Sequence, residues 1–164
     1  MPGPHRLLSA VALGAGLAAG TMTPALAQAG GSARASLAGM SPKTLYLLRC
    51  SGCHRPDGGG AVSAGVPPFP GFIGPMTRDP MGRTYVTHVP GITGSGLSDA
   101  QIASVLNYVL DRWSTGGGSI SQPFTVEEVA ERRAVPVSDI VSYRRALVAR
   151  LTKRGLPVGD YPWP

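Results

Sequence analysis

Two thiols and an imidazole share the five-residue segment Cys50-Ser51-Gly52-Cys53-His54, and the chain has no other cysteine. Cysteines separated by two residues can add to the two vinyl groups on neighbouring pyrroles of a porphyrin. A histidine directly after the second cysteine can then present a ring nitrogen to the iron. The spacing therefore predicts one covalently attached haem c, bound through Cys50 and Cys53, with His54 as the proximal iron ligand.

Three other uses of this segment stay open. A thioredoxin-like redox pair has the same cysteine spacing, but it follows a strand, and no strand pattern precedes Cys50. A structural disulfide would suit an exported protein, although so short a loop would stabilise the fold little. A zinc site could use both cysteines with His54 and His88, but adjacent Cys53 and His54 cannot easily bind one ion, and the histidines lack the usual zinc spacing.

A haem iron held by His54 has one more axial position, and the sequence offers three ligands for it. Met76, Met81 and His88 are the only methionines or histidines after the motif. A thioether stabilises ferrous iron and raises the reduction potential, whereas a second imidazole lowers it. An open position would let small molecules bind and would indicate sensing or peroxide chemistry. The identity of this ligand therefore decides more about function than any other feature.

The N-terminal segment has the layout of a secretory signal peptide. Residues 5–6 give a short basic start, residues 7–19 are small and apolar, and residues 25–27 read Ala-Leu-Ala. The apolar run is broken by glycine and is shorter than the roughly 20 residues of a membrane span. We expect cleavage after residue 27, a flexible leader over 28–39, and a periplasmic product without a membrane span.

The helices that must position the motif are predicted by caps and by periodic apolar residues. Ser41, followed by proline, begins a predicted helix over 42–49 that runs into the cysteines. Ser98 and Gln101 form a capping box at the start of a longer amphipathic helix, which we expect to end near 113. Both helices have apolar residues that could pack on each other and around a cofactor.

The rest of the chain divides into a loop-rich middle and a helical tail. Residues 55–97 hold much of the glycine and proline, and predict long ordered loops with one short helix at 81–86. So long an irregular stretch needs something to organise it, and a bulky apolar cofactor would do so. In the tail, Thr125 begins a predicted helix that stops before Pro136, and a second helix is predicted from 138 or 139 to about 154.

Part of the chain resembles the class I c-type cytochromes. The match consists of the helix that enters the Cys50–His54 motif, the glycine-rich loop 55–60, and a final helix that carries Asn-Tyr-Val-Leu at 107–110. The resemblance implies an all-α fold in which helices and long loops wrap around one covalent haem. It places a cytochrome c domain at 40–115 and a C-terminal helical extension at 116–164.

The resemblance also implies partners for the iron and for His54. In family members with a similar final helix, the sixth ligand lies at a similar distance before that helix and is closely followed by proline. His88 fits this position, with Met81 and Met76 as alternatives. In the family a proline carbonyl often accepts a hydrogen bond from the proximal histidine, and the chain has Pro67 and Pro68 at the corresponding distance.

A protein of this kind is implied to be an electron carrier and not an enzyme. The resemblance suggests that it passes single electrons from a dehydrogenase to a downstream cytochrome or oxidase. Residues 40–154 also look like small exported mono-haem cytochromes found beside amine or alcohol dehydrogenases. The net charge of +6 at pH 7 favours docking to acidic protein surfaces and does not require nucleic acid.

Two other functions stay open at this point. The chain could be a haem protein with an exchangeable sixth ligand, either peroxide-reactive or a sensor, in which His88 serves as a distal base. It could also be the cytochrome subunit of a larger dehydrogenase complex. In that case the extension at 116–164 would bind a partner, or it would fold back and cover the haem.

Overall fold

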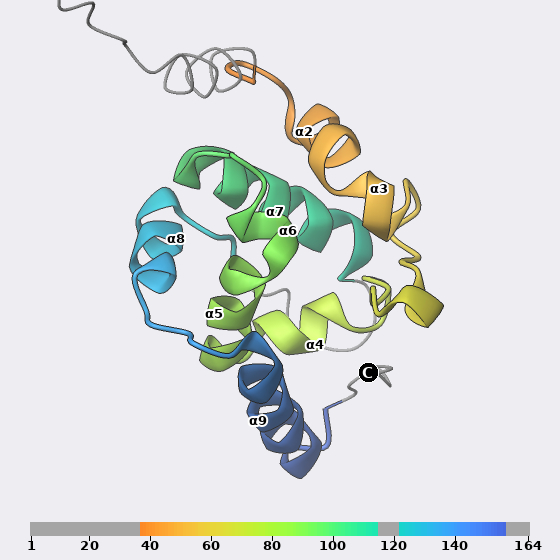
Figure 1. Ribbon diagram of the computed structural model, residues 1–164, viewed down its shortest axis with the longest axis vertical. Helices are drawn as coiled ribbons and strands as arrows, with labels where there is room; N and C mark the ends of the chain where they lie inside the picture. The colour runs from red at the N-terminus through yellow and green to blue at the C-terminus, as the bar shows by residue number, and fades with distance from the viewer. Residues whose placement is uncertain (1–36, 115–121, 157–164) are drawn as a thin grey trace, which may run out of the picture.

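The computed structural model describes residues 37–114 and 122–156, and these ranges fold into helices joined by short turns (Figure 1). Within them the only β pairing is an isolated bridge between Ala61 and Val66, so the expected all-α class is confirmed. The predicted signal peptide and most of the leader lie outside the described residues. Among the helices of these ranges, none combines the length and the apolar character of a membrane span.

The motif lies at the end of α2 (Pro42–Arg49) and in the single turn α3 (Ser51–His54). α2 begins as predicted, because the Ser41 hydroxyl accepts a hydrogen bond from the Thr44 N–H at 3.2 Å. Leu45 and Tyr46 are the buried residues of α2, and the helix packs against α7 (Asp99–Trp113). This contact fixes the entry of the chain into the cysteine motif.

The middle of the chain is more helical than the sequence suggests. It contains the 3-10 turn η1 (Val62–Ala64), α4 (Ile73–Thr77), α5 (Pro80–His88) and α6 (Pro90–Thr93). The single helix expected at 81–86 is the centre of α5. Asp79 caps the start of α5, because its carboxylate accepts a hydrogen bond from the Met81 N–H at 2.9 Å. The expectation of mostly long loops was therefore wrong, since short helices that begin at or include proline show no sustained periodicity.

The longest helix of the described residues, α7, begins and ends as predicted. The Ser98 hydroxyl accepts from the Gln101 N–H and the Gln101 side chain accepts from the Ser98 N–H, which completes the capping box. The two predicted tail helices are also present, as α8 (Val126–Arg133) with Thr125 as its cap and α9 (Ile140–Lys153) with Asp139 as its cap. Caps and periodicity thus located these helices correctly.

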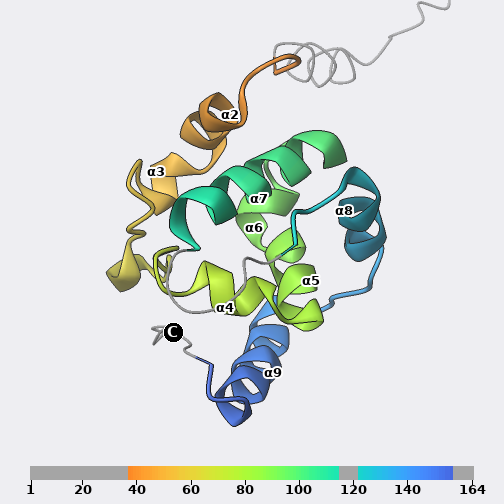
Figure 2. The same ribbon diagram turned by 180° about the vertical axis from the view of Figure 1, so that it is seen from behind.

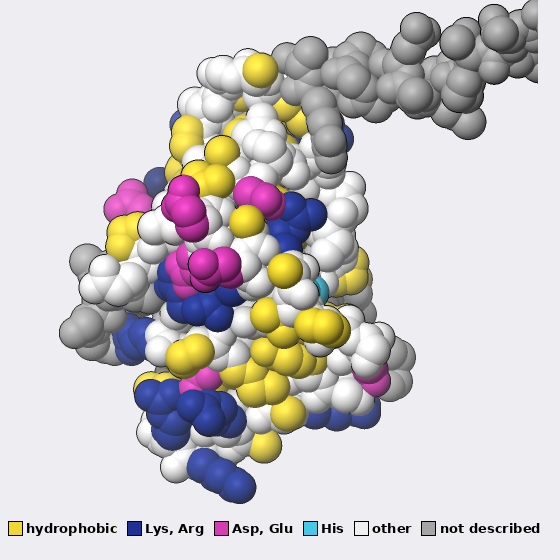
Figure 3. Space-filling view, turned by 90° about the vertical axis from the view of Figure 1, so that its left-hand side faces the viewer, with side chains coloured by type: hydrophobic (Ala, Val, Ile, Leu, Met, Phe, Trp, Pro, Cys, Tyr) yellow, Lys and Arg dark blue, Asp and Glu magenta, His cyan; other side chains and the backbone are white. Residues whose placement is uncertain are grey.

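The C-terminal extension folds back onto the rest of the chain. α8 packs against α7 and α5, and α9 packs against α5 (Figures 1 and 2). Val129 of α8 and Leu147 and Leu151 of α9 are fully buried and belong to the same hydrophobic cluster as the residues of α2 and α7. On the outer face, acidic side chains gather at the level of α8 and basic ones over α9 (Figure 3). The extension therefore shares the core instead of projecting from it.

Candidate functional site

A cavity of about 340 Å³ lies beside the cysteine motif, a volume in the range of small-molecule and cofactor sites. Cys50, Cys53 and His54 form one part of its wall. The remainder is mostly apolar and comes mainly from the 65–69 loop and from α4 to α7 with their flanking residues, while α2 and α9 each add one arginine. Its apolar side chains include Phe69, Phe72, Ile73, Met76, Val86, Val89, Ile92, Val105, Leu106 and Val109. The predicted binding motif and α7 thus meet around one apolar space.

His54 is held in a defined orientation at the edge of this cavity. Its Nδ1 lies 3.2 Å from the carbonyl oxygen of Pro67, and its ring stacks on Phe69 with the centroids 4.1 Å apart. Burial lowers the pKa of the imidazole, against the opposing effect of the Pro67 carbonyl, so the neutral form is favoured. When Nδ1 donates to Pro67, Nε2 is the nitrogen left for a metal, in the form that binds it.

The Pro67 carbonyl is positioned by a tight turn that only glycine allows at residue 60. Gly60 has φ +66°, and an added Cβ would lie 2.5 Å from the Val66 oxygen and 2.6 Å from the Pro67 oxygen. The Gly60 N–H donates to the His54 carbonyl at 3.0 Å, and the bridge between Ala61 and Val66 closes the loop. The turn therefore returns the chain to His54. The resemblance to cytochromes left Pro67 and Pro68 open as partners of this histidine, and the structure places the Pro67 carbonyl beside it.

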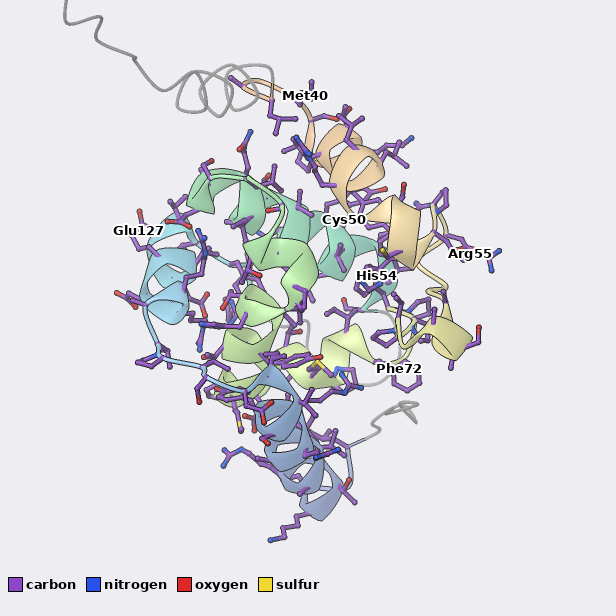
Figure 4. The ribbon with its side chains drawn as sticks, in the orientation of Figure 1. Met40, Cys50, His54, Arg55, Phe72 and Glu127 are labelled. Carbon is purple, nitrogen blue, oxygen red and sulfur yellow. The ribbon has the colours of Figure 1, made fainter. Side chains whose placement is uncertain are left out.

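The two cysteines are separate thiols in the wall of the cavity. Cys50 is half-buried and Cys53 is exposed, and they form no disulfide with each other. Burial, together with the neighbouring Cys53, raises the pKa of Cys50 to about 11. In the side-chain view, Cys50 and His54 lie on the inner side of α3 while Arg55 projects away from the molecule (Figure 4). Among the described residues, no group of three or more His, Cys, Asp or Glu side chains gathers as a zinc site would need.

Of the three candidate sixth ligands, the structure brings only Met76 to the described wall of the cavity. Met76 lies on α4, is 7% exposed and lines the cavity. Met81 is half-buried in the first turn of α5 and is not among the residues that line it. The carbonyl of Met76 approaches α5 at Gly82, where an added Cβ would lie 1.9 Å from it, so close packing of α4 on α5 fixes this methionine.

The expectation that His88 faces the iron does not fit this geometry. His88 ends α5, where its Nδ1 lies 2.9 Å from the Thr84 carbonyl and its Nε2 lies 3.0 Å from the Val135 carbonyl. Both nitrogens therefore face backbone oxygens, one of them in the link between α8 and α9, and the ring is not part of the cavity wall. Counting residues back from α7 missed this, because α6 and its turns occupy the intervening chain.

One residue of the site was not anticipated from the sequence. Arg144, in the middle of α9, is 2% exposed and lines the cavity together with Tyr85 of α5. The sequence shows it only as part of a cluster of basic residues, which is more typical of a solvated helix face. Its burial depends on how α9 docks on α5, and no local pattern reports that docking.

The side chains around the cavity suit the haem that the motif predicts. Two thiols, an imidazole with one nitrogen anchored to the backbone, and a thioether meet at an apolar space, and each of these groups has a known role toward a c-type haem. Comparisons of the chain with protein families, curated proteins and solved structures find no match. The case for the site therefore depends on its own residues and their geometry.

Proposed function

We propose that this chain is a periplasmic mono-haem c-type cytochrome that carries single electrons between a dehydrogenase and a downstream cytochrome or oxidase. The observation that carries the proposal is the convergence of Cys50, Cys53 and His54 on one apolar cavity, with His54 Nδ1 held by the Pro67 carbonyl. A redox pair or a disulfide would need neither the apolar cavity nor the anchored histidine.

Each part of the motif has a separate task in this proposal. When bound, the haem supplies a one-electron couple at its iron. Cys50 and Cys53 hold the vinyl edge of the ring at α3, and His54 binds the iron in the orientation set by Pro67 and Phe69. The apolar side chains of α4 to α7 exclude water from the iron, which lowers the reorganisation that accompanies a change of charge.

Within this function, Met76 takes the sixth position. It is the candidate that lines the cavity, and the helix that carries it packs closely on α5 where the Met76 carbonyl meets Gly82. A thioether in this position favours ferrous iron and a raised reduction potential. A filled sixth position also favours electron transfer over peroxide chemistry, because no open coordination site is left for a small molecule.

The first test is covalent loading. The chain, expressed with a signal peptide in a host that attaches c-type haem, is purified and digested, and the peptide with residues 50–54 is weighed. We expect this peptide to gain the mass of one haem, and the double variant Cys50→Ala/Cys53→Ala to gain none. An unmodified peptide from the natural sequence, made in a host that loads a control cytochrome, would refute the proposal.

The second test identifies the sixth ligand. We expect Met76→Ala to convert the ferric iron from low spin to high spin and to let the ferrous form bind carbon monoxide. Met81→Ala and His88→Ala are matched controls and should stay low spin. A high-spin ferric iron in His88→Ala would instead identify His88 as the sixth ligand, as expected from the sequence. Carbon monoxide binding by the unchanged protein would favour the sensor or peroxide-reactive function.

A further inference from the structure

A buried cation enters the cavity from the C-terminal extension. Arg144 of α9 is 2% exposed and lines the cavity that holds the cysteine motif. Its Nη1 donates to the Tyr85 hydroxyl at 3.3 Å, and its guanidinium carbon lies 5.5 Å from the centre of the Tyr85 ring. A helix of the C-terminal extension therefore contributes a charged group to the proposed cofactor site.

The charge of the cavity wall is one-sided. Among the described residues that line the cavity there is no Asp or Glu, and the charged ones are Arg144 and Arg49. Arg49 is exposed at the end of α2, where water screens it, whereas Arg144 is buried. A guanidinium stays protonated in proteins, and one that lines a cavity can donate charge-assisted hydrogen bonds to a carboxylate that enters it. The cavity is thus suited to a ligand with an anionic group near α9.

The position of Arg144 is fixed by contacts outside the cavity. Arg150 of α9 and Arg154, which directly follows this helix, each bind the fully buried carboxylate of Asp79 at 2.6 Å, and Asp79 caps the start of α5. Leu147 and Leu151 of the same helix are fully buried. These contacts dock α9 on α5 whatever the cavity contains, so the guanidinium is in place before a ligand binds, which lowers the cost of ordering it.

The chemistry of haem supplies the anion at the required end. The vinyl groups and the carboxylate side chains of haem lie on different edges of the ring. In the proposed function the cysteines of α3 hold the vinyl edge, which directs the carboxylates away from α3. α3 and α9 lie on different sides of the molecule (Figures 1 and 2), and Arg144 extends from α9 to the cavity.

We infer that Arg144 binds a haem carboxylate inside the cavity, so that the C-terminal helix is a part of the redox site. The inference rests on the proposed function. A guanidinium can donate two parallel hydrogen bonds to one carboxylate. By neutralising this negative charge near the iron, Arg144 favours the less positive ferrous state and therefore raises the reduction potential. Arg144 acts on the iron through the carboxylate and is a positioning residue.

The experiment compares the haem-loaded protein with Arg144→Gln and with the control Arg145→Gln. Arg145 is the next residue of α9, it is exposed, and its replacement removes the same charge outside the cavity. We expect Arg144→Gln to lower the reduction potential clearly more than Arg145→Gln does. We also expect it to shift the carboxylate bending band of the haem in the resonance Raman spectrum, which Arg145→Gln should leave unchanged.

Arg144→Lys provides a second measurement that does not depend on losing the charge. It keeps a cation but replaces the planar fork by a point charge. We therefore expect a reduction potential close to that of the natural protein, together with a shift of the carboxylate band. An unshifted band in both Arg144 variants, or equal potentials in Arg144→Gln and Arg145→Gln, would overturn the inference. Because these proteins carry covalent haem, such a result would leave the proposed function intact.

Discussion

The two sides of the cavity are held in place by different forces. On the α2 side, the fully buried Tyr46 packs its ring against Phe69, Tyr108 and Trp113, with centroid distances of 6.4, 5.6 and 5.2 Å. On the extension side, Arg83 and Arg132 bind Glu128 of α8, and Arg150 and Arg154 bind Asp79. Aromatic packing thus fixes the residues of the motif, while ion pairs fix the helices that bring Arg144.

Because of this difference, the two sides of the cavity should respond differently to changes of pH and salt. Contacts between aromatic rings depend little on pH or salt, whereas ion pairs weaken when their carboxylates gain protons. Burial by itself would raise the pKa of Asp79, but hydrogen bonds from Arg150 and from the Met81 N–H lower it overall. The motif should therefore keep its geometry under conditions that loosen the extension, and the following variants probe that contrast.

The largest effect is expected at Tyr46. Replacement by alanine removes a fully buried ring from the aromatic cluster and leaves a cavity, which costs about 3–5 kcal/mol of unfolding free energy. Tyr46→Phe keeps the ring but removes the donor that binds the Arg55 carbonyl at 2.6 Å, and should cost about 1 kcal/mol. Denaturant unfolding measures both values, and equal losses for the two variants would mean that the hydroxyl, and not the packing, fixes α2.

The second effect is the loss of stability in acid when the Glu128 carboxylate gains a proton. Hydrogen bonds from Arg83, opposed in part by burial and supported by Arg132, lower the pKa of this carboxyl to about 2 from its usual 4.5. Because the folded pKa is the lower one, the stabilisation is complete above pH 4.5 and is lost as the pH falls toward 2, up to about 3 kcal/mol. Unfolding at a series of pH values should show this loss in the natural protein.

Glu128→Gln separates this carboxylate from the rest of the network. The variant should be less stable than the natural protein near neutral pH and should lose less stability between pH 4.5 and 2. Glu127→Gln is a matched control, since Glu127 is the adjacent residue of α8 and its side chain points outward (Figure 4). Identical acid profiles for Glu128→Gln and the natural chain would assign the acid sensitivity to other carboxylates.

The helices of the two sides were predicted better than the short helices of the middle of the chain. α2, α7, α8 and α9 were located correctly, because Ser41, Ser98, Thr125 and Asp139 act as the local caps that their types suggest. α4 and α6 were missed. Each is a short helix that contains proline, and each packs on α5, its neighbour in the sequence, without a periodicity of its own that would reveal it.

The candidate site was predictable only where its chemistry is local. Cys50, Cys53 and His54 are adjacent in the sequence, so their joint position at one cavity follows from their spacing. The choice among Met76, Met81 and His88 depends on how α5 packs between α4 and the extension, and counting residues cannot supply that. Arg144 was missed for the same reason, since its place in the cavity wall depends on how α9 docks on α5.

A smaller effect is expected at the turn that positions Pro67. Gly60→Ala places a methyl group against the Val66 and Pro67 oxygens in a left-handed backbone conformation, and should cost about 1–3 kcal/mol. Gly71→Ala is the matched control, because Gly71 has φ +81° but no atom within 4 Å of an added Cβ. In the haem-loaded protein only Gly60→Ala should disturb the bond between His54 and Pro67, which would appear as a shift in reduction potential. Equal shifts of the reduction potential in both variants would mean that backbone strain, and not the contact with the Pro67 oxygen, causes the effect.

The smallest effect is expected at the exposed pair between Arg133 of α8 and Asp99 of α7. Both side chains are about a third exposed, at 36% and 33%, so water and salt screen their attraction. Arg133→Ala should change the unfolding free energy by less than about 1 kcal/mol, and this difference should vanish at high salt. Arg83→Met, by contrast, removes a buried cation that binds Glu128 and lies 3.7 Å above the Phe124 ring, so its cost should be larger and should persist in salt. If both variants lost the same stability in low salt and in high salt, the extension would be held by its apolar residues, and the contrast between the two sides of the cavity would disappear.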